Sequence, residues 1–337
     1  MHAIRIHQPG DPSVLVYEDV ANPEPGPGEV RVRLRAAGVN HRDIWVRQGA
    51  FGVFSEPLIP GSDGAGEIDA LGPGARDYAV GQKVVINPGL SCGRCVFCLS
   101  GQQNSCVHYR ILDGTYAEQI VVPIQSVVPM PSGLTFLEAA SIGIGFVTAE
   151  DFLTRAQAAP GQNIVVWGAN GGLGLATIQL ARLRAMRVFA IVRSNAFGDR
   201  LKHFGVHEVI VSDGVAPVSP DILSMTSSKG ADIVVDSLGE ASFTQSVNMA
   251  RRGGTIISVG STSGGKVQLE LGQFFRRRLT LLGAYMGSSA ILPRILPLFA
   301  RGDLVPVIDH TFPLSEAREA HMRMEGHGLF GKIVLDI

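Results

Sequence analysis

The stretch Val165-Val-Trp-Gly-Ala-Asn-Gly-Gly-Leu-Gly-Leu-Ala-Thr-Ile-Gln-Leu-Ala181 decides how the central part of this chain folds. It reads as a buried apolar strand, a glycine turn and a helix that begins near Gly174. The glycine turn would allow the backbone to approach a pyrophosphate, and the free N–H groups at the helix N-terminus favour phosphate. Its spacing departs from the plain G-x-G-x-x-G pattern, and a tight structural loop is the alternative interpretation. In its strand and helix context the turn predicts a dinucleotide site at Gly171, Gly172, Leu173 and Gly174.

Short apolar runs and helical segments alternate on both sides of this turn. Continuous apolar runs separated by helices indicate a parallel sheet that is covered on both faces. The expected strands are residues 163–167, 187–192, 208–211, 232–236, 254–259 and 279–282, with helical segments at 134–155, 174–184 and 199–204.

The first 120 or so residues have a different texture, that of an all-β domain. Residues 29–35 alternate charged and apolar side chains, which places the apolar ones on one face of a strand. Further strands are expected at 64–71, 83–86 and 117–122, and the C-terminal residues 331–337 are expected to rejoin this domain as a strand. A chain of 337 residues is long enough for two domains. We expect one domain from residues 1–124 and 295–337 and a second from residues 125–294.

The composition excludes several classes of protein. Lys and Arg total 29 and Asp and Glu total 30, and this near-neutral balance gives no reason to expect a nucleic acid or an anionic membrane as partner. The 45% hydrophobic and 18% charged residues exclude a disordered chain. The longest uncharged stretch, 156–181, is broken by proline and glycine, so no spanning helix is expected. The N-terminus lacks the apolar run of a signal peptide, so we expect a cytoplasmic protein that acts on a small molecule.

The end of the second strand of the α/β part indicates which nucleotide is bound. An acidic residue there would bind the ribose 2′-hydroxyl of NAD, whereas an arginine would accommodate the 2′-phosphate of NADP. The chain has no carboxylate at this point and reads Val192-Arg193-Ser194-Asn195. Arg193 and Ser194, with Arg200 as a third contact, therefore favour NADP(H). The alternative is that these are solvated residues that follow a strand.

All four cysteines fall within 15 residues, in the spacing C-x2-C-x2-C-x7-C. Four thiolates from one short loop close a tetrahedral Zn²⁺ shell, which leaves no open position for chemistry. The sequence thus predicts one structural zinc, in a lobe of about residues 87–110. Nearby His108 is interpreted as a surface residue, and disulfides are not expected in a cytosolic chain. The zinc ligands are Cys92, Cys95, Cys98 and Cys106.

This cysteine loop, followed by the nucleotide turn, resembles the medium-chain dehydrogenase/reductase superfamily, which includes zinc alcohol dehydrogenases and quinone oxidoreductases. The resemblance covers nearly the whole chain. It implies a discontinuous GroES-like catalytic domain, an inserted Rossmann domain with a doubly wound parallel sheet, and an active site in the cleft between them. It also implies homodimers or homotetramers that pair through the edge of the Rossmann sheet. Five further stretches carry it, at residues 26–33, 36–40, 60–66, 114–118 and 330–332.

The departures from the family pattern bear on the chemistry. Zinc alcohol dehydrogenases hold a catalytic zinc with a cysteine, a histidine and a second cysteine. Here Asn40 and Ser62 stand at the first two of these positions, and residues 141–148 contain no cysteine. Amide and hydroxyl groups are poor zinc ligands, so a catalytic zinc is not expected. A site improvised from His41 and Asp63 is the alternative.

Asn40 and Asp43 resemble the branch of quinone oxidoreductases and enone reductases, which lacks catalytic zinc. Asn40 is a candidate hydrogen-bond donor to the acceptor oxygen, or a turn residue. His41 is a candidate proton donor and Asp43 a residue that orients its neighbours. Trp45, Phe51 and Phe54 are candidates for an apolar pocket, although core packing is the commoner role. Tyr285 is a further catalytic candidate, and Gly260 and Ser261 are candidate contacts to the nicotinamide half of the cofactor.

The sequence therefore predicts an NADPH-dependent reductase of quinones or α,β-unsaturated carbonyls with one structural zinc. Without a Lewis acid, conjugated acceptors are favoured because the charge that arrives with the hydride spreads to a distant oxygen. Two alternatives stay open: an alcohol dehydrogenase with atypical catalytic metal ligands, and a non-catalytic NADPH-binding protein.

Overall fold

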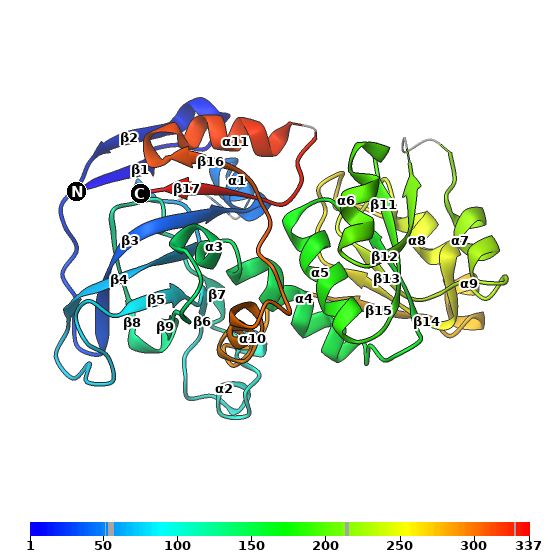
Figure 1. Cartoon of the computed structure of the whole chain (residues 1–337), viewed down its shortest axis with the longest axis horizontal. Coiled ribbons are helices and arrows are strands. Elements are labelled where there is room, and N and C mark those ends of the chain that lie inside the picture. The colour runs from blue at the N-terminus through cyan, green and yellow to red at the C-terminus, as the bar shows by residue number, and fades with distance from the viewer. Residues whose placement is uncertain (51, 53–56, 213–215, 327) are drawn as a thin grey trace. The chain divides into compact units, whose positions relative to one another are not determined.

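The structure is a computed structural model that describes residues 1–50, 52, 57–212, 216–326 and 328–337. The chain folds into two compact units (Figure 1). Unit 1 contains Met1–Val147 and Gly287–Ile337, and unit 2 contains Thr148–Met286. Among the described residues, no helix is both long and apolar enough to cross a bilayer.

Unit 2 is built on a six-stranded sheet in which every neighbouring pair of strands is parallel. Along the sheet the order is β12 (Val206–Val211), β11 (Arg187–Val192), β10 (Asn163–Trp167), β13 (Ala231–Asp236), β14 (Ala250–Ser258) and β15 (Thr280–Gly283). The chain runs outward from β10 in one direction and then restarts beside β10 at β13. This is the doubly wound order of a dinucleotide-binding sheet. The parallel α/β sheet that the sequence predicts is therefore confirmed.

Helices pack against this sheet. Helix α5 contacts β10 and β11, and α8 contacts β13 and β14. One core cluster joins Val165, Phe189 and Val234 of the strands to Ile222 and Val247 of the helices, all of them buried. The helices of unit 2 are the C-terminal part of α4 (Gly143–Arg155), α5 (Gly172–Leu183), α6 (Gly198–His203), α7 (Ser219–Met225), α8 (Phe243–Met249) and α9 (Leu271–Arg276).

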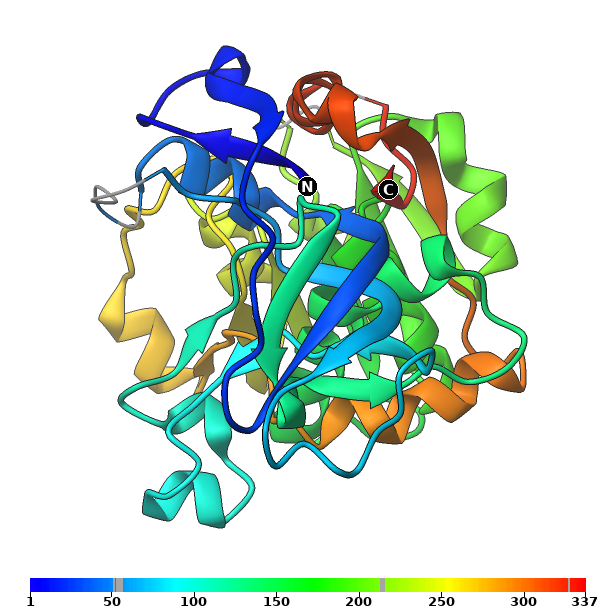
Figure 2. The same cartoon turned by 90° about the vertical axis from the view of Figure 1, so that its left-hand side faces the viewer.

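Unit 1 is mostly β, as the sequence predicts. Its main sheet has the order β16 (Ile308–Pro313), β17 (Lys332–Asp336), β3 (Glu29–Val39), β4 (Asp63–Leu71), β5 (Lys83–Ile86) and β9 (Val127–Pro129), and β8 (Gln119–Pro123) also pairs with β3. Val30, Val32 and Leu34 of β3 are buried, which confirms the alternation read from residues 29–35. The C-terminal strand β17 pairs antiparallel with β3 and so returns to the first domain, as expected. Figure 2 shows both chain termini on this unit.

Several shorter elements of unit 1 have no clear pattern in the sequence. They are the paired strands β1 (His2–Ile6) and β2 (Leu15–Asp19), the pair β6 (Gly89–Leu90) and β7 (Arg110–Ile111), and the helices α1 (His41–Arg47), α2 (Val96–Leu99), α10 (Ile291–Ala300) and α11 (Ala317–Glu325). The predicted helical stretch 134–155 is divided into α3 (Phe136–Ala140) and α4. Helix α3 begins at a capping box, in which the Glu138 carboxylate accepts from the Thr135 N–H at 2.8 Å.

The boundaries of the two units differ from the domain boundaries expected from the sequence. Unit 1 extends to residue 147 and resumes at residue 287, whereas we expected residues 124 and 295. The physical reason lies in β9 and α3, because β9 pairs with β5 and α3 packs on β3 and β4. Residues that follow the last expected strand therefore still belong to the β unit.

Candidate functional site

A polar cluster lies where three neighbouring strands of unit 1 begin or end. Strand β3 lies between β17 and β4, with Ile333 opposite Val39 and Asp63 opposite Gly38. Because both pairs are antiparallel, the end of β3 meets the starts of β17 and β4. This register brings Asn40, Lys332 and Asp63 together.

The hydrogen bonds of the cluster fix the orientation of its side chains. The Asn40 Nδ2 donates to Asp63 Oδ2 at 3.0 Å, and the Lys332 Nζ donates to Asn40 Oδ1 at 2.6 Å. Lys332 Nζ also donates to the Val39 carbonyl oxygen at 2.8 Å and lies 3.3 Å from Asp63 Oδ2. The Ile144 N–H donates to Asp63 Oδ1 at 2.8 Å. Since ammonium only donates and carboxylate only accepts, the Asn40 amide must face Lys332 with its oxygen and Asp63 with its nitrogen.

Asn40 and Asp43 are further joined at the first turn of α1. The Asn40 N–H donates to Asp43 Oδ2 at 2.8 Å, and the Tyr116 hydroxyl donates to the same oxygen at 3.0 Å. Asp43 Oδ1 is buried without a hydrogen-bond partner, and the nearest cation, Arg42 Nη1, is 3.9 Å away. Burial raises the pKa of Asp43 to about 7, an effect that the nearby Arg42 charge opposes. The carboxyl therefore holds the helix start in place.

A buried chain of polar groups continues from Tyr116 to the surface of α11. The Tyr116 hydroxyl oxygen lies 3.3 Å from His321 Nε2, and Arg47 Nη1 lies 3.3 Å from His321 Nδ1. Arg47 ends in an ion pair with Glu325 at 2.6 Å. Burial, and then the Arg47 charge, lower the pKa of His321 to about 3, so the ring is neutral. Because Arg47 only donates, Nδ1 accepts and Nε2 carries the hydrogen that is donated to Tyr116.

The other candidates of unit 1 are placed as follows. His41 is exposed, and its ring centroid is 6.5 Å from that of Trp45. Ser62 is buried, and its hydroxyl oxygen accepts from Arg42 Nη1 at 3.0 Å. Asp63, the partner proposed for His41 in an improvised metal site, is instead held by Asn40, Lys332 and the backbone of α4. Phe51 and Phe54 lie outside the described residues.

The predicted nucleotide turn of unit 2 begins helix α5 at Gly172, two residues earlier than expected. Gly171 is the N-cap, and as a glycine it offers no side chain to cap the N–H groups of the first turn. A Cβ on Gly171 would meet only the Gly168 carbonyl oxygen, at 3.5 Å, so the turn is open. A Cβ on Gly174 would lie 2.7 Å from the Ala169 Cα, so the start of the helix packs closely on the turn that follows β10. A helix N-terminus beside an open glycine turn fits a phosphate group.

Two further loops follow the carboxyl ends of neighbouring strands at the same edge. Gly260 and Ser261 follow β14, and a Cβ on Gly260 would lie 2.7 Å from the carbonyl oxygen of Ser237, which follows β13. Tyr285 follows β15, and its side chain is exposed. Because the strands are parallel, these loops share the edge of the sheet with the glycine turn, where the strand order reverses between β10 and β13.

Asp236, which the sequence analysis missed, organises this edge. Its Oδ1 accepts from the N–H groups of Leu238 and Gly239, both at 3.0 Å, and from the Ser242 hydroxyl at 2.6 Å. Its Oδ2 accepts from the Ser246 hydroxyl at 2.6 Å. In the sequence, the one sign of a role for Asp236 is its position directly after residues 231–235, the apolar run of β13.

The three residues expected to select the nucleotide follow β11 and are all exposed. Ser194 caps a short 3₁₀ turn, since its hydroxyl oxygen accepts from the Ala196 N–H at 3.2 Å. The Arg200 guanidinium lies over the Phe197 ring, 5.8 Å from its centroid. Arg193 directly follows the last residue of β11. This places a cationic, hydrogen-bonding segment at the end of the second strand.

The four cysteines converge in unit 1, and their sulfur atoms all lie within 4.8 Å of one another. The Sγ–Sγ distances include 3.5 Å for Cys92–Cys106, 3.6 Å for Cys95–Cys98 and 3.9 Å for Cys92–Cys98. Four bonds of about 2.3 Å in a tetrahedron place the sulfurs about 3.8 Å apart, so the cluster fits zinc. Backbone N–H groups of residues 94 and 95 lower the pKa of the Cys92 thiol to about 6, which favours the thiolate. Among the described residues this is the one group of three or more His, Cys, Asp or Glu side chains arranged to share an ion.

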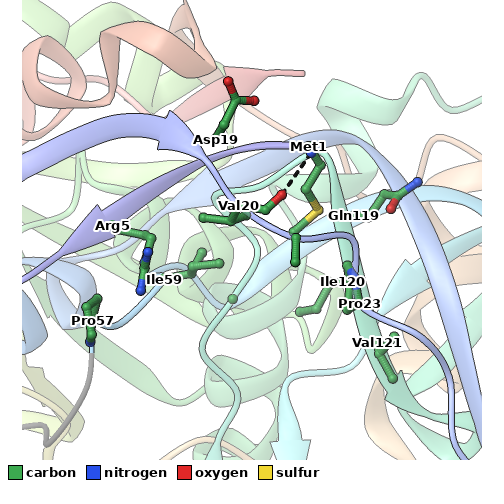
Figure 3. Close-up of a pocket in the computed structure, with 12 residues that line it drawn as sticks. Met1, Arg5, Asp19, Val20, Pro23, Pro57, Ile59, Gln119, Ile120 and Val121 are labelled. Atoms are coloured by element: carbon green, nitrogen blue, oxygen red, sulfur yellow. Dashed lines mark hydrogen bonds between the residues drawn. The ribbon is translucent and has the colours of Figure 1, made fainter.

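A surface pocket of unit 1 lies apart from these groups. It has a volume of about 580 Å³ and is lined mainly by residues of β1, β2 and β8 and the loops beside them (Figure 3). Its one cationic side chain, Arg5, is paired with Glu18 at 2.9 Å. None of the candidate site residues lines it, so the polar cluster and the glycine turn remain the functional candidates.

Comparison with known proteins identifies the family. Residues 26–132 match the alcohol dehydrogenase GroES-like domain, and residues 172–301 match the zinc-binding dehydrogenase domain. An NAD-dependent alcohol dehydrogenase of Sulfurisphaera tokodaii is 31% identical, with 99% of each chain covered. The chain belongs to the medium-chain dehydrogenase/reductase superfamily.

Other members of the superfamily carry two kinds of name. A mouse quinone oxidoreductase is 28% identical, with 99% of this chain and 97% of the relative covered. A solved structure described as an NAD-dependent alcohol dehydrogenase is 40% identical and matches with a TM-score of 0.95, with both chains fully covered. The protein is thus an oxidoreductase of this superfamily, with the GroES-like and Rossmann architecture that the resemblance implies.

Proposed function

We propose that this oxidoreductase reduces quinones or α,β-unsaturated carbonyl compounds with NADPH, with zinc in the cysteine lobe and no metal at the reacting centre. The observation that carries the proposal is the mutual hydrogen bonding of Asn40, Asp63 and Lys332. The Asn40 amide and the Ser62 hydroxyl stand at two of the positions where a catalytic zinc would have a thiolate and an imidazole, and the neighbouring Asp63 carboxylate is already paired with the Lys332 ammonium.

The residues of the chain would then act through hydrogen bonds and orientation. When bound, the nicotinamide cofactor supplies the hydride. The Asn40 amide nitrogen is the proposed donor to the acceptor oxygen, where negative charge develops as hydride arrives. For an enone, hydride adds to the β-carbon, the electron pair moves to the oxygen, and a proton then adds to the α-carbon. His41 and Tyr285 are the candidate proton donors, since both side chains are exposed and carry a polar hydrogen.

Different residues would bind the pyrophosphate, the 2′-phosphate and the zinc ion. The first turn of α5, with the glycine turn before it, would hold the pyrophosphate. Arg193, Ser194 and Arg200 would hold the 2′-phosphate, and the four cysteines would hold one zinc. When bound, this zinc ties the lobe together and takes no part in the reaction because its shell is closed.

The relatives named alcohol dehydrogenase favour a second candidate, an alcohol dehydrogenase with a catalytic zinc held by atypical ligands. Metal analysis of the purified protein separates the two candidates. One zinc per chain, with NADPH oxidised in the presence of a quinone or an enal, supports the reductase. Two zinc ions per chain, with turnover of simple alcohols, would reject it. Cofactor binding without turnover of any acceptor in a broad panel would instead favour a non-catalytic NADPH-binding protein.

Replacing Asn40 by alanine tests the proposed donor in the same assay. Loss of one hydrogen bond to a developing oxyanion lowers kcat by about 10²-fold in well-studied enzymes. We expect a loss of that order with quinone and enal acceptors alike, and an unchanged dissociation constant for NADPH. Ser13→Ala is the matched control, because Ser13 is exposed and its hydroxyl donates to nearby Asp11. Full activity in Asn40→Ala would remove the amide from the mechanism.

Replacing Arg193 by alanine tests the cofactor assignment. A hydrogen bond to a charged group contributes about 1.5–3 kcal/mol, so NADPH binding should weaken by about 10–100-fold. NADH has no 2′-phosphate, and its affinity should change little. Arg187→Ala is the control, since Arg187 lies at the opposite end of the same strand. Equal weakening of NADPH and NADH would contradict the assignment, and isothermal titration of both cofactors decides it.

A further inference from the structure

We propose that Lys332 is a positioning residue whose ammonium group is the fixed cation of this site, held in an oxygen-lined cradle, and that it sets the orientation of the Asn40 amide. The inference rests on the proposed function only for its effect on turnover. The cradle and its cation are properties of unit 1, and they are tested without any substrate.

The cradle is formed by three oxygen atoms that converge on the Lys332 Nζ. They are the Asn40 Oδ1 at 2.6 Å, the Val39 carbonyl oxygen at 2.8 Å and the Asp63 Oδ2 at 3.3 Å. An ammonium group has three hydrogens to donate, and each meets one of these oxygens. One of the three oxygens belongs to a carboxylate, so the cradle and the ammonium balance in charge.

Because both side chains are buried, each charge of the Asp63–Lys332 pair depends on the other. The Asp63 side chain is 1% exposed and the Lys332 side chain is 8% exposed. A buried carboxylate without a cation is strongly unfavourable, whereas the paired and hydrogen-bonded ions satisfy each other. The backbone also packs closely around Asp63, because a Cβ on Gly38 would lie 3.1 Å from the Asp63 Cβ, and one on Gly143 would strike the Asp63 carboxylate. The chain therefore holds the carboxylate in a fixed place.

The same contacts determine which end of the Asn40 amide is available. An amide can rotate by half a turn with little change of shape, so only its partners decide where oxygen and nitrogen point. Lys332 takes the oxygen and Asp63 takes one hydrogen of the nitrogen. Among the described residues, the remaining partner of Nδ2 is the Gly38 carbonyl oxygen, at a weak 3.4 Å. Without the ammonium, the amide oxygen loses its partner, and the contact with Asp63 alone is left to hold the amide in place.

The first experiment replaces Lys332 by alanine and adds back a cation. The substitution removes three carbons and a nitrogen, the atoms of propylammonium. We expect the thermal midpoint of unfolding to fall by about 10 °C because a buried ion pair is broken. Propylammonium should restore most of this fall in the variant and leave the wild type unchanged. Tetramethylammonium, which has the charge but no N–H group, and propanol, which has the length but no charge, should restore none.

The second experiment separates positioning from mere stability. If Lys332 acts through Asn40, the double variant Asn40→Ala with Lys332→Ala should lose no more kcat than Asn40→Ala alone. The KM for the acceptor should change less than kcat, and propylammonium should raise the kcat of the single variant Lys332→Ala but not that of the double variant. If instead the two losses multiply, Lys332 does not act through Asn40 and the positioning role is wrong.

A third variant keeps the test valid if Lys332→Ala does not fold. Lys332→Met combined with Asp63→Asn removes both charges at nearly unchanged volume, so it should be more stable than Lys332→Met alone. An unrescued Lys332→Ala, with equal effects of propylammonium and tetramethylammonium, would overturn the cation cradle. If the wild type reduces no acceptor, the proposed function fails, and thermal rescue by propylammonium still supports the cradle.

Discussion

Asp236→Ala is expected to lower the free energy of unfolding of the protein by about 4 kcal/mol and to weaken NADPH binding. The Asp236 side chain is buried at the end of β13 and accepts four hydrogen bonds. Two of the donors are backbone N–H groups, which cannot turn to another partner when the carboxylate is removed. The buried Ser242 and Ser246 hydroxyls each cost about 1–3 kcal/mol when left unsatisfied, and the two partly buried N–H groups add to this.

The effect on the cofactor follows from the place of Asp236 in the sheet. The oxygens of the Asp236 carboxylate hold residues 237–239 in place. The Ser246 hydroxyl, which donates to this carboxylate, also accepts from the Trp167 indole N–H at 2.9 Å. Trp167 is the last residue of β10, directly before the glycine turn. The carboxylate thus joins the two strands between which the strand order reverses. Loss of this link should loosen the turn that holds the pyrophosphate.

Urea unfolding and titration with NADPH measure the two effects. The matched control is Asp232→Ala, at the start of the same strand. Asp232 pairs with the partly exposed Arg251 and accepts one hydrogen bond from the Asn163 N–H at 2.7 Å, so we expect a smaller loss of about 2 kcal/mol. Asp236→Asn should fall between them, because it keeps one acceptor oxygen. A loss in Asp236→Ala no larger than in Asp232→Ala would show that the network contributes little.

Cys98→Ser is expected to remove the zinc and to leave the lobe at residues 89–111 unfolded while unit 2 still binds NADPH. The reason is that this lobe has almost no core of its own. Val96, Leu99 and Val107 are between 71% and 86% exposed, and α2 has only four residues. Small segments with so little buried apolar surface depend on a metal or a disulfide for their structure. All four cysteines are free, so the metal is the remaining support.

Metal analysis and limited proteolysis check this prediction. The zinc content should fall from one ion per chain to nearly none, and cleavage within residues 89–111 should become fast. His108→Ala is the control, because His108 is exposed beside the cluster and contacts it only through its backbone N–H, 3.4 Å from Cys106 Sγ. Full zinc content in Cys98→Ser, or loss of zinc in His108→Ala, would contradict the assignment of the ligands.

The features that could be predicted from the sequence are those whose residues lie close together in the chain. The glycine turn after β10 needs a strand, a turn and a helix start within about twenty residues, and the bounds of β10 and β11 agree with those predicted. The cysteine loop is equally local, because four thiolates within 15 residues leave few alternatives. Likewise, the alternation of charged and apolar residues in β3 indicates which of its side chains are buried.

The groups that the sequence could not assemble come from distant parts of the chain. Lys332 and Asn40 are 292 residues apart, and Arg47 and His321 are 274 residues apart. Only the strand order β17, β3, β4 makes Lys332, Asn40 and Asp63 neighbours. Periodicity shows which face of a strand is buried, but not which strand lies beside it. The glycine turn that begins α5 and the cluster of four cysteines were therefore determined by the sequence alone, whereas the pairing of strands decided which charge stands beside the Asn40 amide.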